Sequence, residues 1–141
     1  MLSKPFAGWA NFTINTFTFP VSYLTDVPND FIKALTIALR DDISTVVVLD
    51  GESDGDCEII FNTYHDTVSA VHFVPDCEDK VETVFWDENI LSIAKKFIED
   101  IELNYEEWKN WGYDDEPNDF DLTELKNIIE EKEKKIKNFR I

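Results

Sequence analysis

Glycine, cysteine and long apolar runs are all scarce in this sequence. Four glycines and five prolines among 141 residues exclude a low-complexity or collagen-like chain. Cys57 and Cys77 are too few for a disulfide framework, so two buried thiols are expected instead. No apolar run approaches the roughly 20 residues that cross a bilayer, and residues 1–12 lack the apolar core of a secretory signal. A cytoplasmic protein is therefore expected.

Positive charge is the other deficit. Thirteen lysine and arginine residues stand against thirty aspartate and glutamate residues, which gives a formal net charge of −17. So acidic a surface repels nucleic acids and anionic membranes, and neither is expected as a partner. It attracts a basic protein partner and speeds encounter with it. The same charge also keeps a small protein in solution, so a binding role needs further signals.

The first forty residues predict a strand–strand–helix unit within a single domain of residues 1–141. Residues 9–14 and 17–23 alternate apolar and polar side chains, as strands with one buried face do, and the two residues between them indicate a hairpin. A helix is expected at about 27–40, with Thr25 or Asp26 as its N-cap. Its apolar stripe requires a sheet to cover, which the rest of the chain must supply.

The remaining pattern completes an α+β fold. Residues 44–49 are rich in valine and predict a central strand buried on both faces. Three further strands and two helices follow, so the predicted order is ββαββββαα. This order indicates a mostly antiparallel sheet of about five to six strands with helices packed on one face. Residues 9–113 are expected to form the core, with the acidic loop and C-terminal helix of residues 114–141 as an appendage.

The acidic loop at residues 50–56 invites comparison with a calcium-binding loop. Its carboxylates at the first, third and fifth positions and glycine at the sixth match the start of that motif. The twelfth position is Phe61, where a bidentate glutamate is required, and the flanking segments predict strands instead of helices. A solvated turn is therefore favoured over a weak divalent-cation-binding module, and no cofactor is expected.

Signatures of catalysis are thin. No serine lies in a G-x-S-x-G elbow, and no glycine-rich phosphate loop is present. No order or spacing distinguishes a catalytic pair of Cys57 or Cys77 with His65 or His72 from chance. An enzyme of unrecognised type, with a pocket that holds His72 or a cysteine, remains an alternative. A protein that is not an enzyme is preferred, and no catalytic residue is predicted.

Two acidic runs are the strongest functional signal. Residues 41–58 contain seven carboxylates and no basic residue, and residues 99–120 contain nine carboxylates, one lysine and five aromatic residues. Exposed aromatic side chains anchor a partner, while surrounding acids steer a cationic surface toward them. Trp108 is expected to close the core, whereas Trp111 and Tyr113 are expected to be exposed. The predicted partner-binding residues are Asp50, Glu52, Asp54, Asp56, Glu106, Glu107, Trp111, Tyr113, Asp114, Asp115 and Glu116.

In arrangement, the chain resembles the small acidic immunity proteins that accompany bacterial polymorphic or contact-dependent toxins. The resemblance covers about residues 9–113: an α+β pattern opening with WANFTINTFTFPVSYLTDVPNDF, the acidic DGE at residues 50–52, and a helix after Trp86 and Asp87. It implies a binding protein that covers the active site of a basic cognate toxin, often a nuclease, with carboxylates where substrate phosphates would bind. No catalytic residue carries over, and residues 121–141 lie outside the resemblance.

Overall fold

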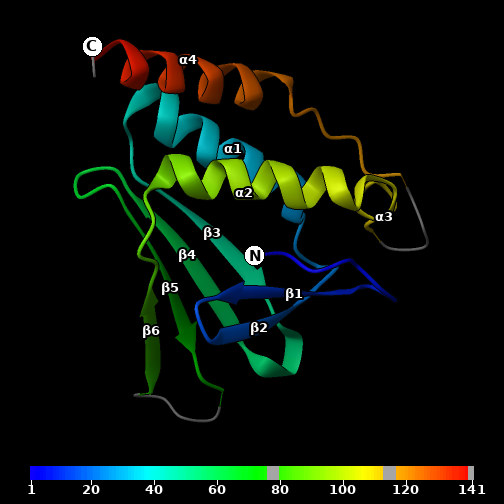
Figure 1. Ribbon diagram of the computed structural model, residues 1–141. Helices are drawn as coiled ribbons and strands as arrows, with labels where there is room; N and C mark the ends of the chain where they lie inside the picture. The colour runs from blue at the N-terminus through cyan, green and yellow to red at the C-terminus, as the bar shows by residue number, and fades with distance from the viewer. Residues whose placement is uncertain (76–79, 113–116, 140–141) are drawn as a thin grey trace.

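The computed structural model describes residues 1–75, 80–112 and 117–139 (Figure 1). The strands are β1 (Trp9–Ile14), β2 (Phe17–Ser22), β3 (Thr45–Asp50), β4 (Asp56–Asn62), β5 (Thr67–Phe73) and β6 (Val81–Phe85). The helices are α1 (Val27–Asp41), the 3-10 turn η1 (Glu52–Asp54), α2 (Ile90–Leu103), α3 (Tyr105–Lys109) and α4 (Thr123–Phe139). The predicted α+β class and element order are confirmed, with the short α3 as an added helix after α2.

The six strands divide into two antiparallel sheets. β1 and β2 form a hairpin, and β3, β4, β5 and β6 form a four-stranded sheet in sequence order. α1 contacts β3 and β4, α2 contacts β5, and β2 contacts β3. The hairpin also places Phe19 against His72 of β5, with 5.1 Å between the ring centroids. The helices and the hairpin therefore cover the same side of the four-stranded sheet (Figure 1).

The core lies between the helices and the covered side of the larger sheet. Phe31 of α1 stacks on Phe97 of α2, with ring centroids 5.3 Å apart, and meets Phe61 of β4 edge-on at 6.2 Å. Phe12 of the hairpin packs edge-on against Trp86 at 5.4 Å. These aromatic contacts join both helices, the hairpin and the sheet in one apolar cluster.

β3 is an edge strand, and the prediction that residues 44–49 form a central strand buried on both faces is wrong. Within the described residues, β4 is its one sheet neighbour. Val47 and Leu49 are buried under α1, whereas Val46 and Val48 are 50% and 48% exposed. The valine content thus reflects the strand preference of β-branched side chains, which does not require burial on both faces.

α4 packs on the body of the protein through its first half. It contacts α1 and α2, and the fully buried Leu125 and nearly buried Ile129 belong to the core cluster. The helix is further linked by ion pairs Arg40–Glu124, Lys126–Glu102 and Lys95–Glu133. The expectation that residues 114–141 form an appendage is therefore wrong for this part of α4. The apolar residues of this helix are sparse in the sequence, yet Leu125 and Ile129 are enough to anchor its first half in the core.

Candidate functional site

Trp111 is buried, and the prediction that it offers an exposed anchor is wrong. Its side chain is 4% exposed, and its ring lies 5.0 Å from that of Trp108 between centroids. The indole N–H donates a 2.7 Å hydrogen bond to the backbone carbonyl of Thr25. That bond offsets the cost of burying the polar N–H, so a tryptophan among acids can turn inward. Tyr113, Asp114, Asp115 and Glu116 lie outside the described residues.

Thr25 joins the two acidic runs. Its carbonyl accepts from Trp111, and its hydroxyl oxygen accepts a 2.7 Å hydrogen bond from the backbone N–H of Asp50. Thr25 itself is 4% exposed. The end of β3, which belongs to the acidic run of residues 41–58, therefore meets the turn after α3 at one buried residue. Sequence spacing contains no signal for this long-range contact.

We expect Trp111→Phe to lower the free energy of unfolding more than Trp108→Phe does. Both changes shrink a buried ring, but Trp111→Phe also deprives the Thr25 carbonyl of its donor, which adds about 1–3 kcal/mol. The Trp108 indole N–H has no hydrogen-bond partner among the described residues, so its loss costs no such bond. Urea unfolding of both variants measures the difference. Equal losses would contradict the role of the Thr25 hydrogen bond.

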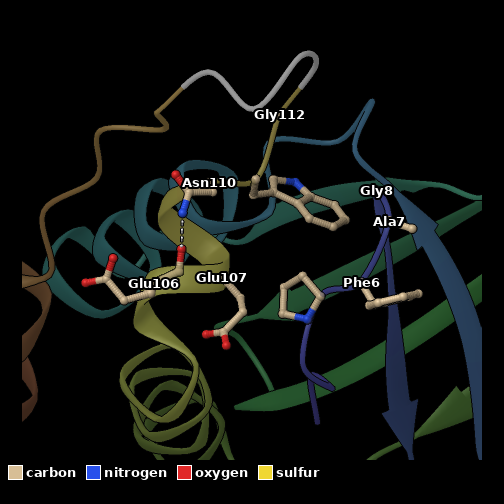
Figure 2. A pocket seen from close by; sticks show the side chains of 9 residues that line it. Phe6, Ala7, Gly8, Glu106, Glu107, Asn110 and Gly112 are labelled. Atoms are coloured by element: carbon tan, nitrogen blue, oxygen red, sulfur yellow. Dashed lines mark hydrogen bonds between the residues drawn. The ribbon is translucent and has the colours of Figure 1, made fainter.

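A pocket of about 410 Å³ lies between α3 and the N-terminal loop (Figure 2). Glu106, Glu107 and Trp111 are among its lining residues, so the structure gathers three of the predicted partner-binding residues there. Figure 2 shows Glu107 between the helix and the loop, while the Glu106 carboxylate points away from the loop. The loop contributes Phe6, whose side chain is 84% exposed. The pocket therefore combines negative charge with an accessible aromatic ring.

A tight turn places Phe6 at this pocket. Phe6 and Trp9 exchange two backbone hydrogen bonds, of 2.8 and 3.0 Å, and Ala7 and Gly8 between them have φ of 52° and 81°. A Cβ on Gly8 would lie 2.8 Å from a ring carbon of Tyr23, so the turn favours glycine there. Phe6 was not predicted as a site residue because it lies outside both acidic runs. An aromatic residue just before a glycine turn was the available signal.

The predicted acids differ in whether they have a cation beside them. The Glu107 carboxylate lies 3.2 Å from the Lys4 ammonium group. The pKa of Glu107 is lowered, first by a hydrogen bond to backbone N–H and then by Lys4. Within the described ranges, the remaining predicted acids form no ion pair. These acids are Asp50, Glu52, Asp54, Asp56 and Glu106.

The loop at residues 50–56 is a compact acidic turn. The backbone N–H of Gly51 donates to the Gly55 carbonyl at 2.8 Å, and the Asp50 carboxylate accepts from the N–H of Glu52 at 2.7 Å. A Cβ on Gly51 would lie 2.5 Å from the ring of Phe19, so glycine lets the loop approach β2. No group of three or more histidine, cysteine, aspartate or glutamate side chains in the described part of the chain is placed to hold a metal ion.

Cys57 and His72 lie on the covered side of the sheet. Cys57 is fully buried, and burial, followed by repulsion from Glu58, raises the pKa of its thiol to about 12. His72 Nε2 lies 2.8 Å from the carbonyl oxygen of Asp54. Because the thiolate is the nucleophilic form of cysteine, Cys57 is poorly suited to nucleophilic catalysis. Cys77 lies outside the described residues.

Across the residues that the structure describes, no helix combines the length and apolar character that a membrane crossing requires. A comparison with known proteins found no matching family model, no matching curated protein and no matching solved structure. The protein's own surface chemistry is therefore the guide to its function.

Proposed function

We propose that this protein binds a basic partner protein and neutralises it, as immunity proteins do to their cognate toxins. The observation that carries the proposal is that five of the predicted partner-binding acids form no ion pair among the described residues. They belong to a chain whose formal net charge is −17. Unpaired acids can meet lysine and arginine side chains of a partner without first breaking contacts of their own. A nuclease is the expected class of partner, because it uses basic groups to hold phosphates.

Binding would proceed in two stages. Long-range attraction first brings the basic surface toward the acidic one, and this stage weakens as added salt shortens the screening length to about 8 Å at physiological ionic strength. Short-range docking then places carboxylates where the partner's substrate phosphates would lie. The bound protein thereby excludes substrate from the partner's active site.

Capture at two salt concentrations tests this proposal. The protein would be immobilised, exposed to an extract of its source cell at low and at high salt, and the bound proteins identified. We expect one basic protein at low salt and less of it at high salt. The captured protein, once purified, should lose its nuclease activity when this protein is added in equal amount. Absence of a partner at both salts, or undiminished activity of the partner, would overturn the proposal.

Removing charge from the loop at residues 50–56 should slow association. We expect the Glu52→Gln and Asp54→Asn double variant to bind the captured partner roughly three- to tenfold more slowly at low salt. Both side chains are exposed and form no ion pair in the described structure, so the melting temperature should stay unchanged. Stopped-flow mixing measures the rate.

A matched control removes the same charge elsewhere. Asp87→Asn with Glu131→Gln changes two exposed acids that likewise form no ion pair among the described residues. This variant should associate nearly as fast as the unmodified protein, because its charges lie away from the loop. Equal slowing by both double variants would show that net charge alone matters and would refute a specific role for residues 52 and 54.

A further inference from the structure

The four-stranded sheet has a side that none of the described elements covers. We call this side the open face; it is opposite the one packed against α1, α2 and the hairpin (Figure 1). Side chains alternate between the two sides of a strand, so residues next to the buried ones point to the open face. Five apolar side chains there are 42–63% exposed. They are Val46, Val48, Phe73, Val81 and Phe85.

Strand register makes these side chains neighbours. One row across the sheet runs Val46, Ile60, Ser69, Phe85, and the next runs Val48, Glu58, Val71, Thr83. Phe73 pairs with Val81 beyond the second row. Directly opposed and diagonal side chains in adjacent strands lie within contact distance of one another. Ile60 of β4 and Val71 of β5, which are partly exposed on the same face, join the five residues into one patch across the four strands.

A groove continues this patch around the free edge of the sheet. It has a volume of about 420 Å³ and lies between β3 and α1. Val46 and Val48 line it together with Ala34 and Ile37 of α1, and Asp30 and Lys33 of α1 add one charge of each sign. An antiparallel sheet with one solvated face normally carries polar residues on that face. An exposed apolar patch in that position is instead typical of a site of protein association.

The charges on the open face favour a basic occupant. Alternation places Asp50, Asp56 and Glu58 on this face beside the apolar patch. β3, β4, β5 and β6 contain no lysine or arginine. A second copy of the chain would oppose these acids with its own and bring two net charges of −17 together. A partner with lysine or arginine around an apolar centre would complement both the apolar patch and the acids beside it.

We propose that the open face is the surface on which the basic partner docks. Its valine and phenylalanine side chains form the dehydrated centre of the interface, and Asp50, Asp56 and Glu58 pair with cations of the partner beside that centre. This inference rests on the proposed function and adds to it the surface that the partner contacts. It also assigns the final docking to an apolar surface. The apolar side chains of the open face would anchor the partner in place of Trp111, which is buried.

The test replaces apolar side chains of the open face while keeping the strands. Val46→Thr, Val48→Thr and Phe85→Thr would be combined, because threonine suits a strand and leaves the net charge unchanged. We expect this variant to retain its melting temperature to within a few degrees and to bind the captured partner at least tenfold more weakly by calorimetry. The control combines Leu24→Thr, Leu103→Thr and Phe139→Thr, which are exposed apolar residues outside the sheet.

The outcomes separate the two proposals. Weak binding by the open-face variant with normal binding by the control supports docking on the open face. Normal binding by both variants would overturn this inference and leave the proposed function standing. Absence of any partner for the unmodified protein would overturn both. A concentration-dependent dimer that the open-face variant cannot form, seen by sedimentation, would assign the surface to a second copy and also overturn the inference.

Discussion

Replacing Phe31 by alanine is expected to lower the free energy of unfolding by about 3–5 kcal/mol. The ring is fully buried and contacts Phe97 of α2 and Phe61 of β4, at centroid distances of 5.3 and 6.2 Å. Alanine would leave a cavity where both helices meet the sheet, because none of these elements can move in without losing other contacts. Domains of this size are stabilised by only about 5–15 kcal/mol, so much of the stability would disappear.

Urea unfolding followed by tryptophan fluorescence measures this loss. Phe139→Ala is the control, since that ring is 92% exposed and its removal should change stability by less than about 0.5 kcal/mol. A loss below about 1 kcal/mol for Phe31→Ala would contradict its central place in the core, because buried phenylalanine truncations cost far more than that.

Leu125→Ala should destabilise the protein by about 2–5 kcal/mol, although it lies near the C-terminal end of the chain. Leu125 is fully buried, and its helix contacts both α1 and α2. The loss should therefore affect the whole protein, with one transition in which helix and sheet unfold together. Thermal unfolding followed by circular dichroism measures both the shift and the number of transitions.

A second alanine variant in the same helix distinguishes core packing from helix propensity. Ile136 is 44% exposed, so Ile136→Ala should cost less than about 1 kcal/mol. If α4 were an appendage, Leu125→Ala would leave the main transition in place and melt only part of the helical signal. Similar small effects from both variants would likewise contradict the packing of α4 on α1 and α2.

Local patterns account for the part of the fold that was predicted from sequence. The apolar stripe of α1, including Phe31, recurs at helical spacing, and the polar residues before it supply a cap. Asp26, one of the two predicted N-caps, accepts from the N–H of Asn29. The turn at Asn15 follows from its left-handed φ of 51°, which asparagine tolerates. Such features depend on residues a few positions apart, so spacing alone is sufficient to identify them.

Features that depend on distant contacts could not be predicted in this way. Trp111 is surrounded by acids in sequence, yet its neighbour in space is Thr25. The strand that contains Val46 and Val48 has the composition of a buried strand, and only the sheet order shows that β3 lies at an edge. The candidate site divides in the same way: its acids are evident in the sequence, whereas the apolar surface beside Asp50 depends on the register of four strands.

The burial of Cys57 has a consequence for how this protein meets oxidants and electrophiles. A fully buried thiol whose pKa is about 12 remains protonated at neutral pH and out of reach of reagents in solution. Cys57 can therefore react only in the rare molecules in which β4 has separated from the hairpin and helices that cover it. The rate of that opening would limit the rate at which Cys57 is modified, so the folded sheet protects the thiol kinetically.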